Sequence, residues 1–136
     1  MADGTITQKL DKLFGGDMLV LTFTCTASAD LATFPSTATS TAITNAIQGY
    51  YLLEGRTNPG ATAPQALYDI VLNDTDGIDI MGGTMANRSA TASEAAAPFI
   101  ASGVFQPRPV DGALTLVISG NNVNSAGTVV KFFFTR

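Results

Sequence analysis

The 136-residue sequence contains no histidine and no tryptophan, and its one cysteine is Cys25. Histidine is the commonest general base, the usual activator of serine and cysteine nucleophiles, and the commonest metal ligand. Its absence excludes a Ser-His-Asp or a Cys-His hydrolase, and a single cysteine cannot supply the several ligands that zinc needs. Because Cys25 lies within an alternating apolar pattern, we expect it to be a buried, inert thiol.

Charge is scarce as well. Charged residues make up 13% of the chain, hydrophobic residues make up 46%, and the net charge is −4. Since about a quarter of the residues of an ordinary soluble domain are charged, the composition favours a surface partly covered by other molecules. A neutral surface of Thr, Ser, Asn and Ala is the alternative. The seven basic residues form no patch that could follow a phosphate backbone, so we expect no nucleic-acid binding.

Long apolar runs are also missing. No stretch approaches the roughly 20 apolar residues that cross a bilayer, so we expect no membrane association. Residues 1–4 show no basic start followed by an apolar run, which indicates that a cleaved secretory signal is absent. We therefore expect synthesis and folding in a host cytoplasm.

What the sequence does contain is apolar alternation typical of β-strands. Over residues 18–26, apolar side chains alternate with Val and Thr, which is the pattern of a half-buried strand. The Ala-, Ser- and Thr-rich segment 28–44 is expected to be a loop that can include a short edge strand, and 84–97 a helical turn or a surface loop. Further strands are expected over residues 47–56, 68–73, 78–81, 99–105, 113–119 and 128–136.

Two pairs of these strands are expected to form hairpins. Residues 74–77 form an Asp-Gly turn between the strands 68–73 and 78–81. The Gly- and Asn-rich segment 120–127 joins the last two strands, which would pair in the core. Several strands with short turns predict an all-β fold, an antiparallel β-sandwich or barrel, in a single domain over residues 17–136.

The first 16 residues are expected to form a short helix or an arm. Ile6, Leu10, Leu13 and Phe14 recur at helical spacing, and two glycines follow them. A helix of about ten residues is marginal in isolation. It would pack on its own domain or lie on a neighbouring subunit, and both interpretations stay open. In the second case, these four residues are candidate subunit contacts.

Asp74, Asp76 and Asp79 lie close together and offer the oxygen ligands that Ca²⁺ prefers. The spacing of a calcium loop fails, however, because placing Gly77 at the sharp turn puts Leu72 at the first ligand position. A hairpin turn explains the same residues without a metal, and we favour it, although a bound cation stays open. We expect no cofactor, no metal site and no catalytic residue.

Several strands are apolar on their second face too, at Val20, Val71, Val129 and Phe133. The outer face of a sandwich is normally polar. A helix, a loop or another subunit is therefore expected to cover these positions, unless they are singly exposed apolar residues, which are common.

Turn and strand motifs follow one another in a defined order. These motifs are Leu13-Phe14-Gly15-Gly16, Arg56-Thr57-Asn58-Pro59-Gly60-Ala61-Thr62-Ala63-Pro64, Tyr68-Asp69-Ile70, Asp76-Gly77-Ile78-Asp79, Ala86-Asn87-Arg88, Leu114-Thr115-Leu116-Val117-Ile118-Ser119-Gly120-Asn121 and Val129-Val130-Lys131-Phe132. Their order resembles small virion structural proteins of tailed bacteriophages, over most of the chain. The resemblance implies a homo-oligomeric virion protein present in many copies, foremost a capsid decoration or cement protein that binds the major capsid protein or other virion proteins.

Alternatives to cement remain. The same resemblance fits a neck, tail or baseplate component, whereas a carbohydrate- or receptor-binding β module would need exposed aromatic residues, which are few here. A stand-alone β-domain with a small-ligand pocket is a further alternative. Asn87 and Arg88 join the N-terminal residues as candidate subunit contacts, since arginine is favoured at interfaces. The alternative for Arg88 is an ordinary solvated charge.

Overall fold

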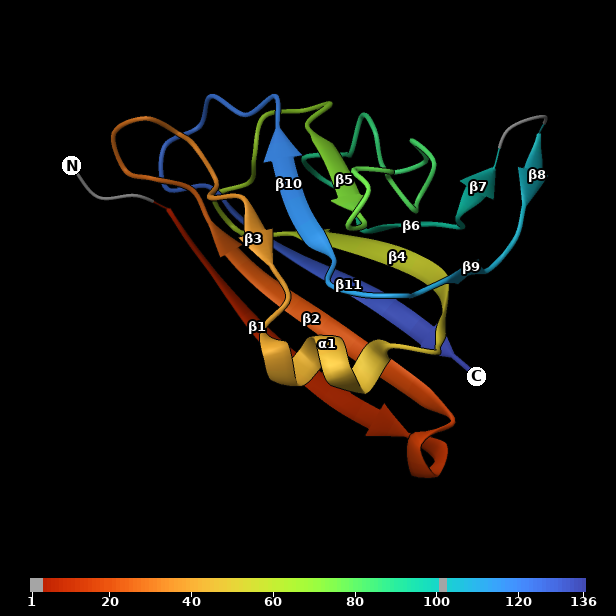
Figure 1. Cartoon of the computed structure of the whole chain (residues 1–136). Coiled ribbons are helices and arrows are strands. Elements are labelled where there is room, and N and C mark those ends of the chain that lie inside the picture. Colours follow the sequence, from red (N-terminus) through yellow and green to blue (C-terminus); the bar gives the residue numbers. More distant parts are fainter. Residues whose placement is uncertain (1–3, 101–102) are drawn as a thin grey trace.

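The computed structural model describes residues 4–100 and 103–136 and shows an all-β protein built of two antiparallel sheets, packed as a sandwich (Figure 1). The larger sheet has the order β1-β2-β11-β4-β6, with β9 also on β4. Its strands are β1 (Thr5–Leu13), β2 (Met18–Thr26), β4 (Tyr51–Pro59), β6 (Glu94–Ala96), β9 (Arg108–Pro109) and β11 (Gly127–Thr135). The sequence predicted a sandwich or a barrel, and of these two alternatives the fold is a sandwich.

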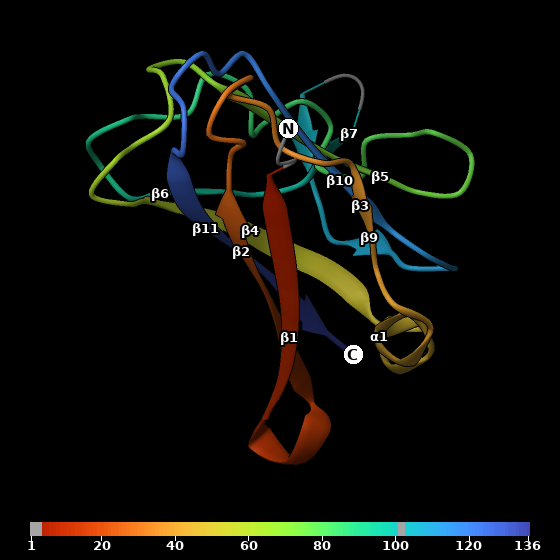
Figure 2. The same cartoon turned by 90° about the vertical axis from the view of Figure 1, so that its left-hand side faces the viewer.

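The second layer is shorter. It contains β3 (Thr37–Ala38), β10 (Thr115–Ser119) and β5 (Asp69–Asn73), in the order β3-β10-β5. The helix α1 (Thr41–Ile47) lies beside this sheet and covers the lower part of the larger one (Figures 1 and 2). A separate hairpin consists of β7 (Phe99–Ile100) and β8 (Val104–Phe105). Burial of Ile47 and Ile43 against the core fixes the helix in this place.

The core lies between the two sheets and follows from alternation. Every second residue of β2, β10 and β11 points inward, and the rings of Phe23 and Phe132 meet edge to face, with their centres 6.0 Å apart. A fully buried side chain of this size contributes about 1.5–3 kcal/mol to folding. The inward residues of these strands are Leu19, Leu21, Phe23, Cys25, Leu116, Ile118, Val130, Phe132 and Phe134. The expected burial of Cys25 is confirmed.

The predicted N-terminal helix is wrong, because residues 5–13 form strand β1 in register with β2. Ile6 and Leu10 are four residues apart, a spacing that suits one face of a helix and equally one face of a strand. The strand places them opposite the core residues Cys25 and Leu21. Phe14–Gly16 then form a single 3-10 turn. Residues 4–16 are therefore part of the sandwich, and residues 1–3 lie outside the described residues.

The predicted terminal hairpin is also wrong. β10 pairs with β3 and β5, whereas β11 pairs with β2 and β4, so the segment 120–126 crosses from one sheet to the other. Leu116 and Phe132 still share the core, but they enter it from opposite sheets instead of from neighbouring strands. Alternation identifies the buried face of a strand and says nothing about its neighbour in the sheet.

The hairpin turn at 74–77 is confirmed, although its second strand hardly forms. Asp74 N–H donates to the Ile78 carbonyl at 2.9 Å, and an isolated bridge joins Asn73 to Asp79. Ile80 and Met81 are both buried, so the alternation expected over 78–81 does not hold. The chain turns inward here instead of continuing along β5.

The segments expected as loops contain short elements. The predicted edge strand in 28–44 is β3, but α1 follows it, with the Ser40 hydroxyl accepting the Ile43 N–H at 3.2 Å as an N-cap. The helix delays the start of β4 to Tyr51. Segment 84–97 contributes β6 to the larger sheet. Of the single strand predicted over 99–105, Phe99–Ile100 and Val104–Phe105 are two short strands that pair with each other, and residues 101–102 lie outside the described residues.

Candidate functional site

The most exposed large apolar side chain in the described residues is that of Phe14, at the tip of the β1–β2 hairpin. Phe14 is 75% exposed and Leu13 beside it is 38% exposed. The hairpin projects past α1 in both views (Figures 1 and 2), and its turn is held by Tyr50 and Arg136, whose hydroxyl and N–H donate to the carbonyls of Gly16 and Asp17. A projecting aromatic ring left in water is the kind of group that anchors a protein interface.

The other two N-terminal candidates do not share this surface. Ile6 and Leu10 are half-buried on the inner face of β1, where they pack against the core. Their partners in β2 are Cys25 and Leu21. The structure therefore separates the four predicted contacts into two that support the fold and two, Leu13 and Phe14, that are presented to solvent.

Arg88 is neither a solvated charge nor an exposed contact. Its side chain is 12% exposed, and Nη2 donates to the Thr84 carbonyl and to a second carbonyl of the same loop, each at 3.0 Å. Nη1 lies 3.8 Å from a carboxylate oxygen of Glu94. Asn87 is exposed and has a φ of 58°, and its N–H donates to the Asp69 carboxylate at 2.8 Å. The guanidinium thus holds its own loop.

The aspartates of the 74–79 segment bond to the backbone around them. The Asp79 carboxylate accepts three N–H bonds, at 3.0, 3.1 and 2.9 Å, and Asp74 Oδ1 accepts two, both at 2.9 Å. The donors are Leu72, Met81 and Gly83 for Asp79, and Asp76 and Ile78 for Asp74. Among the described residues, no three His, Cys, Asp or Glu side chains are grouped to hold a metal ion. These bonds are those of a side-chain-stabilised turn.

A second exposed apolar surface lies on the β7–β8 hairpin, which sequence reasoning missed. Val104 is 44% exposed and Phe105 is 62% exposed, and the Phe105 ring meets Phe99 at 5.1 Å. The hairpin stands beyond both sheets, on the right of Figure 1. Gly103, with a φ of 80°, lies between its two aromatic residues. A glycine between two short apolar runs was the available signal for a turn.

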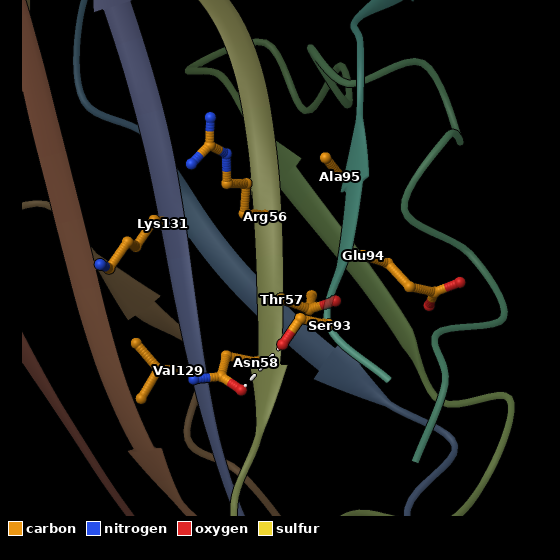
Figure 3. Close-up of a pocket in the computed structure, with 8 residues that line it drawn as sticks. All are labelled: Arg56, Thr57, Asn58, Ser93, Glu94, Ala95, Val129 and Lys131. Atoms are coloured by element: carbon orange, nitrogen blue, oxygen red, sulfur yellow. Dashed lines mark hydrogen bonds between the residues drawn. The ribbon is translucent and has the colours of Figure 1, made fainter. Parts of the chain in front are cut away.

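The outer face of the larger sheet carries a polar hollow of about 330 Å³ between β4, β6 and β11 (Figure 3). The Arg56 guanidinium lies 4.3 Å from the centre of the Phe133 ring and pairs with Glu54. The Ser93 hydroxyl donates to Asn58 Oδ1 at 3.0 Å. The residues that line the hollow are Arg56, Thr57, Asn58, Ser93, Glu94, Ala95, Val129 and Lys131. It has no aromatic wall on which a sugar ring could stack.

The apolar residues of the outer face are covered only by their neighbours. Val20 is 8% exposed and Phe133 is half-buried, with the Arg56 side chain over its ring. Figure 2 shows no described helix or loop over the outer side of β1 and β2. The cover expected from a helix, a loop or another subunit is not needed for these two positions, because Val20 is buried within the described chain and Phe133 lies under Arg56 of the same face.

Two groups with a shifted pKa, among the residues that the structure describes, are buried in the core. Burial raises the pKa of the Cys25 thiol to about 12. Burial also raises the pKa of the Tyr68 phenol, whose hydroxyl forms a 2.9 Å hydrogen bond with Thr128. Since the thiolate is the reactive form of cysteine, Cys25 is chemically quiet near neutral pH.

The chain matches no protein-family model, no curated protein and no solved structure. In the part of the chain that the structure describes, no helix has the length and apolar character needed to cross a membrane.

Proposed function

We propose that this protein is a non-catalytic structural component of a tailed-phage particle, and specifically a capsid decoration or cement protein that binds the assembled coat lattice. The observation that carries the proposal is the projecting β1–β2 hairpin, whose tip presents Leu13 and Phe14 to solvent. The motif order described above supports the assignment to a virion. The partner is the major capsid protein, and the protein is made in the host cytoplasm before it joins the particle.

The physical argument for cement concerns assembly. A protein that binds the expanded lattice and not its separated subunits stabilises the lattice by mass action. Weak contacts repeated in many copies gain strength from multivalency. A rigid sandwich with an aromatic residue at the end of a hairpin suits such a contact, because ordering the ring costs little entropy when it enters a pocket on the coat.

The proposal of a non-catalytic role has independent support. The sequence has no histidine, and its one thiol is buried with a raised pKa. The carboxylates of Asp74 and Asp79 accept backbone N–H bonds and so serve the turn.

Heat-driven DNA release from particles tests the proposal. Particles that lack the protein are expected to release DNA at a lower temperature than complete particles, and adding the purified protein should restore the higher temperature. The Phe14→Ser variant should restore it less well, because it lacks the aromatic anchor, whereas Lys131→Ser, on the outer face of β11, should restore it fully. Equal release temperatures with and without the protein contradict a cement role.

The position of the protein in a density map of the particle separates cement from the main alternative. Copies spread over the shell agree with decoration. A single ring at one vertex instead identifies a neck, tail or baseplate component, which is the second role that the motif order fits.

The polar hollow of Figure 3 favours one further candidate, a carbohydrate- or receptor-binding module. Its Asn58, Ser93 and Lys131 side chains offer hydrogen bonds to hydroxyl groups. Binding of the isolated protein to a glycan array, abolished by Asn58→Ala, would support this candidate. If the protein binds no glycan on the array, the carbohydrate-binding role of the hollow is contradicted.

A further inference from the structure

The outer edge of β1 is open over its nine residues. Among the described residues β1 pairs with β2 alone, and no loop or side chain bonds to the backbone of its other edge. Figure 2 faces this edge and shows no element across it. The register with β2 runs from Thr5 to Leu13 without a bulge, and the strand contains no proline. A long, regular edge of this kind is a template for pairing with another strand.

The ladder between β2 and β11 identifies the backbone groups on this edge. At one end of the ladder, the Ala27 N–H donates to the Ala126 carbonyl at 2.8 Å. At the other end, the Arg136 N–H donates to the Asp17 carbonyl at 3.2 Å. In an antiparallel sheet, each residue directs its N–H and C=O groups to the same neighbouring strand, and the next residue directs them to the strand on the other side. Because Ala27 and Asp17 bond to the β11 side, the odd-numbered residues of β2 bond to β11, and the even-numbered residues bond to β1.

The register then transfers this alternation to β1. Even-numbered β2 residues lie opposite odd-numbered β1 residues, for example Thr22 opposite Lys9. The odd-numbered residues of β1 therefore bond to β2, and the even-numbered ones direct their N–H and C=O groups to the open edge. These even-numbered residues are Ile6, Gln8, Leu10 and Lys12.

The side chains of β1 are complementary to a second β1 in one antiparallel register. When the Leu10 residues of two copies lie opposite each other, Lys9 of each copy lies opposite Asp11 of the other. These two pairs fall between the hydrogen-bonded pairs, where cross-strand side chains approach most closely. Within one copy, Lys9 Nζ lies 3.8 Å from Asp11 Oδ1, and 75% of the Lys9 and 49% of the Asp11 side chain is exposed, so a second copy would replace one loose surface pair with two cross-strand pairs.

The two neighbouring registers of the strand pair bring like charges together. A slip of two residues, which keeps each side chain on its own face of the sheet, places Lys9 opposite Lys9 in one direction and Asp11 opposite Asp11 in the other. Like charges directly opposite each other destabilise a strand pair. The charges therefore select the register centred on Leu10, in which the two leucines also meet on the inner face.

We propose that two copies of this chain pair antiparallel through their β1 edges, about a twofold axis at Leu10, and join their larger sheets into one. The occupant is a second copy because the charge pattern of β1 complements itself, as a twofold contact requires. The two Phe14 tips then point away from each other at opposite ends of the strand pair. The pairing does not depend on the proposed function, because it is a property of the isolated chain.

Sedimentation of the full chain at micromolar concentrations tests the pairing. The unchanged chain is expected to be a dimer. Lys9→Asp and Asp11→Lys should each raise the dimer Kd at least tenfold, because each places like charges opposite each other twice. An equimolar mixture of the two variants should dimerise again, since every acidic position in the mixed pair faces a basic one. Another dimer surface would not produce this rescue.

Lys131→Asp is the matched control, because it makes the same charge change at an exposed residue of β11, which β2 separates from β1. It should leave the dimer Kd unchanged, and circular dichroism should show that all variants fold. A monomeric unchanged chain overturns the proposal. So does a dimer that neither single variant weakens, or a mixture of the variants that stays monomeric.

Amide hydrogen exchange gives a second readout. With rising protein concentration, the amides of Ile6, Gln8, Leu10 and Lys12 should exchange more slowly, whereas those of the odd-numbered residues, already bonded to β2, should not change. Protection confined to another segment also overturns the proposal. Neither measurement involves a particle, so a failure of edge pairing is distinguishable from a failure of the cement role.

Discussion

The β1–β2 hairpin and the segment 69–88 both lie at the surface and both carry charged residues, but they use their polar groups in opposite ways. In the segment 69–88, the side chains of Asp69, Asp79 and Arg88 bond to backbone groups of the same segment. In the hairpin, Lys9 and Asp11 are exposed and form a loose ion pair at 3.8 Å, and the one side chain that bonds to the described turn, the Tyr50 hydroxyl, comes from outside the hairpin and donates to the Gly16 carbonyl.

This difference separates structural charges from charges that are open to a partner. A carboxylate that already accepts three N–H bonds would have to give them up to bind another molecule, at the cost of leaving those donors unpaired. Lys9 and Asp11 would exchange only water and their exposed 3.8 Å ion pair, and a surface pair of this kind contributes little. This difference supports the proposed contacts on the hairpin, and it assigns the bonded side chains of the segment 69–88 to the stability of the fold.

The largest expected difference between the two regions concerns two glycines with the same φ of 66°, Gly82 and Gly15. A Cβ added to Gly82 would lie 1.9 Å from the Phe99 carbonyl oxygen, whereas one added to Gly15 would meet nothing within 4 Å. Gly82→Ala should cost about 3 kcal/mol or more, from backbone strain and overpacking together. Gly15→Ala should cost roughly 1–2 kcal/mol, from strain alone. Urea denaturation measures both, and equal losses would contradict the comparison.

Asp79 and Asp11 provide the next comparison. Asp79→Ala removes the acceptor of three backbone N–H groups and should cost about 3 kcal/mol, at roughly 1 kcal/mol for each bond. Asp79→Asn keeps one carbonyl oxygen and should lose about half as much. Asp11→Ala changes an exposed side chain and should stay within about 0.5 kcal/mol. Denaturant midpoints of protein diluted below the dimer Kd give all three values, and a costly Asp11→Ala would show that the hairpin charge is structural within the single chain.

Cys25 tests whether the inner side of the hairpin belongs to the core. Its pKa of about 12 in the folded protein exceeds the ordinary value of 9.0, so the unfolded chain loses its proton first as the pH rises. The corresponding stability is complete below pH 9 and is lost from pH 9 up to about 12, by about 1.4 kcal/mol for each pH unit. Between pH 9 and 10, before Tyr68 adds its own loss, Cys25→Ala should lose stability less steeply. Parallel pH profiles for the two proteins would contradict a buried thiol.

Parts of the fold could be predicted because they depend on neighbouring residues. Alternation identifies the buried faces of β2 and β11, and the 74–77 turn is encoded by its own Asp and Gly residues. Strand pairing depends on residues far apart, so β10 and β11 could not be assigned to different sheets from the sequence. For β1, the spacing of Ile6 and Leu10 fits both a helix and a strand, and only pairing with β2 decides between them.

The candidate subunit contacts could also be predicted only in part, because their exposure depends on how distant parts of the chain fold together. Phe14 is exposed as an interface residue should be, although the helix from which it was inferred does not exist. Arg88 looks like a loop charge in the sequence, because its contact with Glu94 and its bonds to its own loop appear only after folding. The open edge of β1 has no local signal, since it follows from which strand happens to lie last in the sheet.

The smallest expected effect on stability, and the most informative about the hairpin, comes from Phe14→Ser. Replacing a ring that is 75% exposed should change the free energy of unfolding by less than about 0.5 kcal/mol, because little of its contact area is lost. The same change at Phe134, which is fully buried in β11, should cost at least about 3 kcal/mol. Thermal and urea unfolding of dilute protein compare the two variants. A loss above 1 kcal/mol at Phe14 would mean that the ring packs on its own chain in solution, and the hairpin tip would then have no apolar surface to offer a coat subunit.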